Sequence, residues 1–331
     1  MIRSGKPFVL LGMVVALVAV SALAVSVGAA GISLGEVVDI FFGNGEEISR
    51  TIVLDLRLPR VAFAGLVGCG LALSGVVFQA LLRNPLAEPY ILGVAGGAAA
   101  GAVTALIFWG VAVSGIVLSG FAFAGAILSI VTVIAIATRV GRGLDTRVLL
   151  LTGVVIGAFF NSIILLLVNF TDAETFRAAM FWMMGSFSGA TGKDVAFFAV
   201  YLLPIGVVLM LLARPLNLLA AGEQTAFYLG VNIQVLKLVS YFVASLIVAV
   251  SVAMSGAIGF VGLIVPHATR LVLGSDHRTL LPAAAVVGAI FMIVADTLAR
   301  IVVQPTELPV GVVTALIGVP VFLVLLIKQA R

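Results

Sequence analysis

The chain has 331 residues, of which 63% are hydrophobic and only 10% are charged, and its formal net charge is +4. A soluble globular protein is about half apolar and about a quarter charged, whereas the mean hydropathy here is +1.31. The composition therefore excludes a soluble enzyme and a disordered chain. Because Cys69 is the one cysteine, it also excludes a scaffold held by intrachain disulfides. It indicates a membrane protein that crosses the bilayer several times.

Stretches free of Asp, Glu, Lys and Arg define the expected transmembrane helices, because a helix needs about 20 apolar residues to cross the bilayer core. In chain order they cover residues 7–35, 61–82, 89–138, 148–171, 195–213, 238–269, 279–295 and 308–327. The third stretch would be roughly 75 Å long as a single helix, so we expect two spans with a turn between them. The sixth stretch is long enough for one full span and a short one.

The distribution of positive charge decides the number of spans, because cytoplasmic loops carry an excess of Lys and Arg. If ten spans leave both ends of the chain inside, twelve of the 18 lysines and arginines lie inside: Arg3, Lys6, Arg83, Arg139, Arg142, Arg147, Arg214, Lys237, Arg270, Arg278, Lys328 and Arg331. Nine spans would divide these cations evenly. We therefore expect an all-α integral membrane protein with ten transmembrane helices and with cytoplasmic N- and C-termini.

Motifs for catalysis or for self-contained energy coupling are missing from the sequence. A Walker A loop requires Gly-Lys followed by Ser or Thr, but the two Gly-Lys pairs precede Pro7 and Asp194. His267 and His277 have no partners at metal-ligand spacing. We also expect no carboxylate in the middle of a span, where ion-coupled transporters often keep one. The sequence therefore predicts no catalytic residue, no metal site and no cofactor in this chain.

Several short segments between the spans carry a signal. Arg57 and Arg60 flank a proline just outside the second span, where they either anchor lipid headgroups or meet acidic residues of a partner. Residues 83–89 form a tight inside turn with two prolines. Residues 214–237 predict two short amphipathic helices, broken by Gly222 and stopped by Gly230, that lie in the membrane interface or are covered by a partner.

A weak internal similarity is also present. Ala-Leu-Ser-Gly at 72–75 is followed by Pro85, and Ala-Met-Ser-Gly at 253–256 is followed by Pro266, with the same spacing between glycine and proline. In the ten-span topology the first string passes inward and the second passes outward. This arrangement predicts an inverted-topology repeat. The glycines and the proline after residue 255 also predict a broken helix there.

These segments resemble one family, the FecCD-type permeases of ABC importers for iron chelates, haem and cobalamin. The most specific strings are Gly-Phe-Val-Gly-Leu-Ile-Val-Pro-His at 259–267 and Glu-Leu-Pro-Val-Gly-Val-Val-Thr at 307–314. The resemblance extends from about Leu56 to the C-terminus. It implies one transmembrane permease domain over residues 1–331, with the type II ABC importer fold and a cytoplasmic coupling loop at 214–237. Further matches lie at 57–60, 84–87, 181–189 and 222–223.

The resemblance also implies partners and a location. Two permease chains, expected here as a homodimer, form a central pathway in the membrane lipid. Two ABC ATPase subunits bind ATP and Mg below it, and an extracytoplasmic substrate-binding protein delivers the chelate from outside. No nucleic acid is involved. The expected location is the plasma (inner) membrane of a bacterium or archaeon. Iron-siderophore complexes are the commonest substrates of the family and are expected first, with haem and cobalamin as the other classes.

Individual roles follow from the same resemblance. The residues expected to couple the chain to the ATPase are Leu219, Ala220, Gly222 and Glu223. Those expected to dock the binding protein are Arg57, Arg60 and Arg300. Those expected to line the pathway or its cytoplasmic gate are Asn84, Leu86, Asp145, Thr146, Thr152, Asn161, Ser162 and Asn169. Asp145 and Arg147 make the second gate loop more charged than is usual for the family.

The alternative from another class is a self-sufficient secondary transporter or channel for a small solute. Such a protein has no need of the loop at 214–237, whereas an importer fails without it. An intramembrane hydrolase would require a nucleophile paired with a base, and we find no such pair in the sequence.

Overall fold

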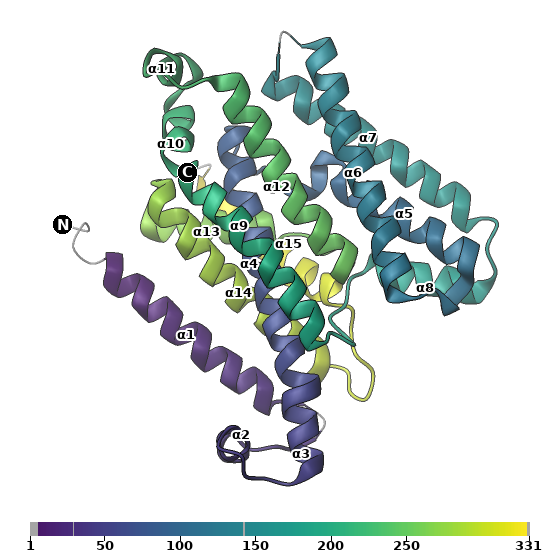
Figure 1. The fold of residues 1–331 in the computed structure, drawn as a ribbon. Helices are drawn as coiled ribbons and strands as arrows, with labels where there is room; N and C mark the ends of the chain where they lie inside the picture. The colour runs from purple at the N-terminus through teal and green to yellow at the C-terminus, as the bar shows by residue number, and fades with distance from the viewer. Residues whose placement is uncertain (1–5, 29, 142, 330–331) are drawn as a thin grey trace.

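The computed structural model describes residues 6–28, 30–141 and 143–329, and every regular element in these ranges is helical (Figure 1). Eight apolar helices are long enough to cross a membrane, and two shorter apolar stretches lie in α13 (Val261–Leu273) and in the first part of α15 (Val310–Val324). The long ones are α1 (Lys6–Ser26), α4 (Leu58–Leu81), α5 (Val94–Trp109), α6 (Gly115–Val140), α7 (Thr146–Val168), α9 (Gly192–Leu211), α12 (Ile233–Ser255) and α14 (His277–Ile301). Each expected span overlaps one of these helices, although several helices extend beyond the uncharged stretch, as α14 and α12 do. Arg3, Arg142 and Arg331, counted above as inside cations, lie outside the described residues.

The two longest apolar stretches divide where the sequence predicts. The first gives α5 and α6, separated by a short 3₁₀ turn, η3 (Gly110–Ala112). The second gives α12 and the short α13 (Val261–Leu273), with a break over residues 256–260. Gly256 ends α12 with φ +73°, a left-handed conformation that favours glycine. The predicted broken helix is therefore confirmed.

The segment outside the second span is more helical than the sequence predicts. It contains α2 (Leu34–Phe41) and α3 (Glu47–Thr51), and α3 continues through a π-helical turn, η1 (Ile52–Arg57), directly into α4. One continuous helix thus begins at Glu47 rather than beside Pro59. The search for uncharged stretches missed this extension, because its charged residues lie beyond the apolar part of the helix.

Helix α4 is the central element of the fold. In its most apolar window 83% of the residues are buried, against 11% for α1, which lies at the edge. It packs against α9, α12, α13 and α14, while α5, α6 and α7 pack on one another as a second group (Figure 1). Helix α15 (Val310–Gln329) contacts α13 and α14. One continuous hydrophobic core joins the two groups.

Glycines allow the closest helix contacts. A Cβ atom at Gly75 of α4 would lie 2.0 Å from the carbonyl oxygen of Gly262 in α13, and one at Gly97 of α5 would lie 2.4 Å from that of Gly125 in α6. Small residues let backbones approach in lipid, where helices associate by packing rather than by the hydrophobic effect. These glycines therefore set the distances between helices.

The positions that suggested an inverted repeat differ in local structure. Gly75 lies inside α4, whereas Gly256 ends α12. Pro85 lies in a turn, whereas Pro266 lies inside α13. These residues therefore give the repeat no structural support, and the repeat stays a prediction.

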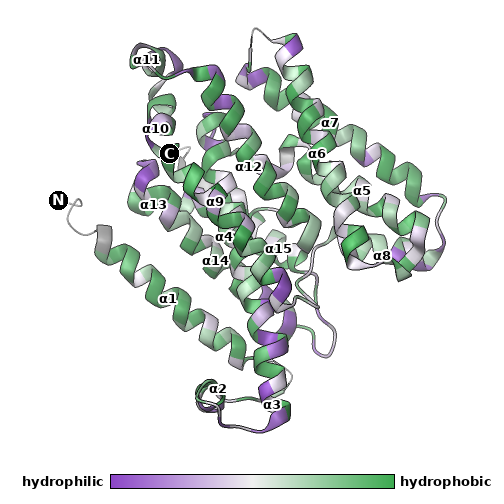
Figure 2. Ribbon diagram, in the orientation of Figure 1, coloured by the Kyte–Doolittle hydropathy of each residue, from purple (hydrophilic) through white to green (hydrophobic). Residues whose placement is uncertain are grey.

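The two ends of the helix bundle differ in what they carry. Two short helices, α10 (Ala213–Ala221) and α11 (Glu223–Tyr228), lie at one end, and α2 and α3 lie at the other (Figure 1). Helix α1 begins and α15 ends on the half that carries α10 and α11. Hydrophobic residues cover most of the long helices, while hydrophilic residues gather around α11 and around α3 and the start of α4 (Figure 2).

Candidate functional site

The loop at 214–237 has the structure that the sequence predicts. Two short helices, α10 and α11, meet at Gly222, whose φ of +137° and ψ of 144° are accessible mainly to glycine. Gly230 follows α11 with φ +82° and turns the chain toward α12. The break and the stop assigned to the two glycines are therefore confirmed.

Helix α10 is fixed to the membrane-embedded helices. Leu216 and Leu219 are fully buried on its inner face, while Ala220 is exposed on the outer face. The Asn217 side chain donates a 2.8 Å hydrogen bond to Asp276 and accepts one of 2.9 Å from the backbone N–H of His277, at the start of α14. Of the expected coupling residues, Leu219 thus belongs to the packing face rather than to the free surface.

Helix α11 is tied to α12 by an ion pair and presents an apolar tip. The Lys237 ammonium lies 2.8 Å from the Glu223 carboxylate, at the first residue of α11. At the other end of α11, the side chains of Phe227, Tyr228 and Leu229 are 66%, 83% and 62% exposed. Exposed aromatic residues at the end of a polar loop are typical of a protein contact surface.

The two expected gate loops are both ordered by side chains that bond to their own backbone. In the first, the Asn84 side chain accepts a 2.9 Å hydrogen bond from the N–H of Leu86. In the second, Asp145 caps α7 by accepting hydrogen bonds from the N–H groups of Arg147 and Val148 at 2.8 Å and 3.2 Å. Within the described part of the chain, no hydrogen bond joins one loop to the other. Thr146, also expected there, has a buried hydroxyl without a hydrogen-bond partner.

The second expected gate loop is bound by two residues of α12, Gln234 and Lys237, which the sequence did not single out as site residues. Leu144, just before the cap, is buried. Its N–H donates a 2.7 Å hydrogen bond to the Gln234 side chain, and its carbonyl accepts one of 3.0 Å from Lys237. Both partners lie in the first turns of α12. A lysine one turn inside an apolar helix was the available signal, but in the sequence it counted only toward the charge balance.

The expected pathway residues of α7 differ in exposure. Asn161, Ser162 and Asn169 are exposed on the surface of the chain, whereas Thr152 is 8% exposed and packs inside it. The Ser162 hydroxyl donates to the carbonyl of Ala158 within the same helix. The pathway role of these four residues stays a prediction.

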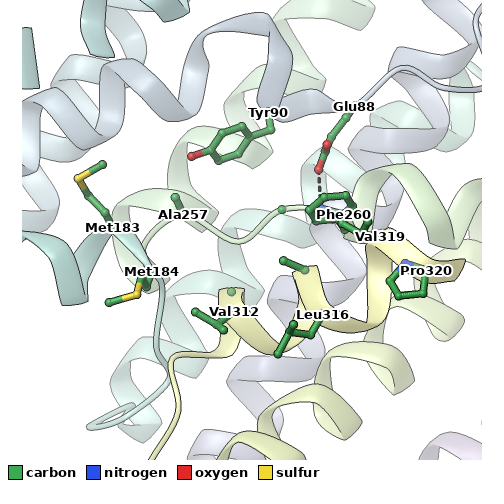
Figure 3. A pocket seen from close by; sticks show the side chains of 13 residues that line it. Glu88, Tyr90, Met183, Met184, Ala257, Phe260, Val312, Leu316, Val319 and Pro320 are labelled. Carbon is green, nitrogen blue, oxygen red and sulfur yellow. Dashed lines mark hydrogen bonds between the residues drawn. The ribbon is translucent and has the colours of Figure 1, made fainter. Parts of the chain in front are cut away.

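A cavity of about 750 Å³ lies beside the break between α12 and α13. Its wall is almost entirely apolar and is formed by the turn before α5, the end of α8 (Ala173–Met183), the break itself and α15 (Figure 3). The residues that contribute large side chains are Tyr90, Met183, Met184, Phe260, Val312, Leu316, Val319 and Pro320.

Glu88 is the acidic residue of this wall. It precedes the 3₁₀ turn η2 (Pro89–Leu92), and its carboxylate accepts a hydrogen bond from the N–H of Phe260, the residue before α13 (Figure 3). The sequence reasoning placed this carboxylate on a cytoplasmic turn. The structure instead folds it back against the break, where a backbone N–H left free by the interrupted helix requires a partner.

The three arginines expected to dock a partner lie together at the end of the bundle that carries α2 and α3, but Arg57 and Arg300 are buried and Arg60 is largely buried. Arg57 donates to the carbonyls of Val25, Ser26 and Ala30 at 2.6–3.0 Å. Arg300 donates to the carbonyls of Ala24 and Val27 at 3.0 Å and 3.1 Å. The two guanidinium groups thereby satisfy carbonyls that the end of α1 leaves free.

Arg60 lies at the centre of a charged cluster. It donates to both oxygens of Asp296 at 2.9–3.1 Å and to both oxygens of Glu307 at 2.9 Å and 3.0 Å. Arg300 Nε lies 3.3 Å from the carboxylate of Asp296, one helical turn earlier in α14. Asp296 is only 1% exposed, while the Glu307 side chain is 44% exposed. The cluster joins α4, α14 and the segment before α15.

Comparison with known proteins gives the family. The sequence profile of the FecCD transport family matches residues 15–328. The chain belongs to the FecCD transport family. It is 46% identical to the cobalamin import system permease protein BtuC of Halobacterium salinarum, over 85% of this chain and 74% of that protein. It is 41% identical to the vitamin B12 import system permease protein BtuC of Salmonella typhi, over 84% of each chain.

Solved structures agree with this membership. A metal-chelate type ABC transporter in an inward-facing conformation superposes with a TM-score of 0.88 at 34% identity, over 97% of this chain and 99% of the other. PsaBC from Streptococcus pneumoniae, at 17% identity and a TM-score of 0.53, shares the fold alone. The chain is thus a permease subunit of an ABC importer, and the family resemblance drawn from its motifs is confirmed.

In a FecCD permease the arrangement above has a simple consequence. The ordered polar structure lies at the two ends of the bundle, with α10 and α11 at one and the arginine cluster at the other. The cavity between them has one described carboxylate, Glu88, and otherwise apolar walls. This wall therefore offers a ligand mainly apolar contact.

Proposed function

We propose that this chain forms the membrane pathway of an importer for a corrinoid of the cobalamin type. The observation that carries the proposal is the 46% identity to a permease named for cobalamin import, together with a second such relative at 41%. This changes the order expected from the sequence, which placed iron-siderophore complexes first. Iron-siderophore complexes and haem remain the competing substrate classes.

The cavity beside the α12–α13 break supports a large and mainly apolar substrate. Its volume of about 750 Å³ falls in the range of ligand pockets, and its lining of Met, Tyr, Phe and aliphatic side chains offers contact area without fixed charge. The Glu88 carboxylate already accepts a backbone hydrogen bond. A wall of this kind favours a substrate that is passed along over one that is tightly held.

The topology belongs to the same proposal. Ten membrane crossings with cytoplasmic ends place α10 and α11 inside, and α2, α3 and the arginine cluster outside. The positive-inside distribution supports this orientation, as does the placement of the two sets of helices at opposite ends. The proposed location is the plasma (inner) membrane of a bacterium or archaeon.

Two ATPase subunits, which bind ATP and Mg, are proposed to seat on α10 and α11. The exposed tip at 227–229 and the exposed Ala220 offer them a surface, while Gly222 sets the angle between the two helices. A second copy of this chain completes the pathway. The expected role of α7, with Asn161, Ser162 and Asn169 facing that pathway, is part of this proposal.

On the outer side, a substrate-binding protein is proposed to dock near the arginine cluster. Arg57, Arg60 and Arg300 use their hydrogen bonds within the chain, so their proposed contribution is to shape the docking surface and to raise its positive potential. The exposed Arg50 and Arg177 are better placed to meet acidic residues directly.

The test is uptake into proteoliposomes that contain this permease with its ATPase and its binding protein. Labelled cyanocobalamin, a ferric siderophore and haem are offered in turn, with ATP or with a non-hydrolysable analogue enclosed on the cytoplasmic side. We expect ATP-dependent uptake of cyanocobalamin above that of the other two. Preferred uptake of the siderophore or haem would overturn the substrate proposal, and uptake by the permease alone without ATP would favour the secondary transporter.

A further inference from the structure

The loop residues 143–145, expected to belong to the cytoplasmic gate, are connected to the expected coupling helix α11 through one buried side chain. Lys237 Nζ donates to the carbonyl of Leu144 at 3.0 Å and to the Glu223 carboxylate at 2.8 Å. Glu223 is the first residue of α11, and Leu144 is the residue before the cap of α7. A single ammonium group therefore contacts the loop that would form the gate and the helix that would contact the ATPase.

Burial makes this connection stiff. The Lys237 residue is 3% exposed, although it lies only in the second turn of α12. A buried ammonium requires hydrogen-bond acceptors, because its desolvation is costly when it is unpaired. Two of its three donors are engaged by Leu144 and Glu223. If α11 moves, Glu223 moves with it. Lys237 then either keeps both hydrogen bonds and displaces Leu144, or loses one of the two.

A second contact holds the same loop residue from the same helix. Gln234, one turn before Lys237, accepts the N–H of Leu144 at 2.7 Å. Gly143 has φ +93°, and a Cβ atom there would lie 2.6 Å from the Gln234 side chain. The positive φ favours glycine at this position, the loop lies directly against the Gln234 side chain, and both polar groups of the Leu144 backbone are bound to α12.

The hydrogen bonds that hold α10 connect it to a different helix. Helix α10 is bonded through Asn217 to the start of α14. This contact runs into the central group of helices and not toward α7. Among the described hydrogen bonds and ion pairs, the route from α10 and α11 to the gate loop therefore passes through Glu223 and Lys237.

We propose that Lys237 is a positioning residue that transmits displacement of α11 to the gate loop before α7. The inference rests on the proposed function, because it assumes that an ATPase displaces α11. The proposed bridge consists of three groups: the Glu223 carboxylate, the Lys237 ammonium and the Leu144 carbonyl. The permease in which this bridge is cut still binds the ATPase and still allows ATP hydrolysis, but hydrolysis no longer drives the gate.

The experiment compares Lys237→Met and Glu223→Gln with the unmodified chain, each assembled with ATPase and binding protein in proteoliposomes. Methionine keeps most of the length of the Lys237 side chain but removes its hydrogen bonds to Leu144 and Glu223. Glutamine keeps an oxygen that can accept from Lys237. The matched control is Arg278→Met, which removes an exposed cation at the same end of the bundle.

Two quantities are measured, namely substrate molecules taken up per ATP hydrolysed and nucleotide-dependent hydrogen exchange of the segment 141–146. For Lys237→Met we expect uptake per ATP to fall about fivefold to tenfold, as for loss of a typical coupling between sites, and exchange in the loop to stop responding to nucleotide. For Glu223→Gln we expect a smaller fall in the same direction, because the amide oxygen can still accept from Lys237 but no longer carries the charge of the ion pair. For Arg278→Met we expect both quantities to stay close to those of the unmodified chain.

Unchanged uptake per ATP together with an unchanged loop response in Lys237→Met would overturn the proposal. So would a uniform loss of hydrolysis and uptake at constant ratio, because that indicates a structural role. If Lys237→Met does not assemble, Glu223→Ala is measured in its place, with the same fall expected and with normal coupling as the contradicting result. An unmodified complex that takes up substrate without ATP would refute the proposed function itself, and this outcome is separate from the variant arms.

Discussion

Replacing Arg60 with methionine tests the charged cluster at the start of α4 and the end of α14. Methionine keeps much of the volume of the arginine stem but removes every hydrogen bond to Asp296 and Glu307. The Asp296 residue is 1% exposed. Among the described residues, Arg60 donates every side-chain hydrogen bond that its carboxylate accepts, while Arg300 contributes an ion-pair contact at 3.3 Å. Removing one partner of a buried ion pair typically costs about 3–5 kcal/mol, because it leaves a buried charge uncompensated. Here the Asp296 charge is left uncompensated except for the longer contact with Arg300, so we expect a loss at the lower end of that range.

The matched variant is Glu307→Gln, which removes the charge of the other acidic partner of Arg60. The Glu307 side chain is 44% exposed, and exposed ion pairs contribute about 0–1 kcal/mol. The structure therefore predicts that Arg60→Met lowers the free energy of unfolding several times more than Glu307→Gln. Adding Asp296→Asn to Arg60→Met removes the uncompensated charge and should recover a substantial part of the loss.

The assay is unfolding of the purified permease in maltoside micelles titrated with dodecyl sulfate, followed by the fluorescence of Trp109 and Trp182. Equal effects of Arg60→Met and Glu307→Gln would show that the buried pair is not what stabilises this end of the bundle. A double variant no more stable than Arg60→Met alone would refute the argument that an uncompensated Asp296 charge is the cause.

Two further predictions concern packing and capping. Gly75→Ala should destabilise the chain by about 1–3 kcal/mol in the same assay, because its Cβ would lie 2.0 Å from the Gly262 carbonyl, whereas Gly120→Ala, with no atom within 4 Å, should be neutral or slightly stabilising. Similar effects at both sites would contradict the packing argument. The backbone N–H groups of Arg147 and Val148 hold the pKa of Asp145 below its usual range. Asp145→Ala should therefore increase hydrogen exchange in the first turn of α7 at neutral pH by removing about 1 kcal/mol of capping, and the difference from the unmodified chain should vanish as the pH falls through the lowered pKa. A difference that persists there would show that the carboxylate is not the cap.

Helix positions could be predicted from the sequence because lipid imposes a minimum length of apolar chain on every span. The division of 89–138 into two helices and the break after α12 follow from that length and from glycine. The start of the second span could not be placed, since the α3–η1–α4 helix extends through charged residues that a search for uncharged stretches rejects.

The coupling loop was predictable in detail because Gly222 and Gly230 are local signals whose backbone conformations need no tertiary partner. The roles of side chains that meet across the fold were not. The sequence shows Arg57 and Arg300 as cations near a membrane surface, but only the fold places both against the carbonyls at the end of α1. In the same way, Glu88 belongs to a turn in the sequence and to the α12–α13 break in space.

Lys237 illustrates the same limit. In the sequence it is one of the cations counted on the inner side, and it directly precedes the uncharged stretch at 238–269. Its significance depends on Glu223 and Leu144, which are 14 and 93 residues away along the chain. Contacts of that separation follow from packing and not from local pattern, so the bridge could be found only in the folded chain.

We propose that this permease is driven by a separate ATPase that seats on α10 and α11. The most direct measurement is extraction of the protein from its native membrane in a mild detergent, followed by mass spectrometry of the intact complex, for the unmodified chain and for a variant with Phe227 and Tyr228 changed to alanine. We expect an ABC-type ATPase in stoichiometric amount in the complex of the unmodified chain. We expect the variant to be folded but to be extracted without the ATPase. A permease that is extracted alone and transports substrate without ATP would contradict the account.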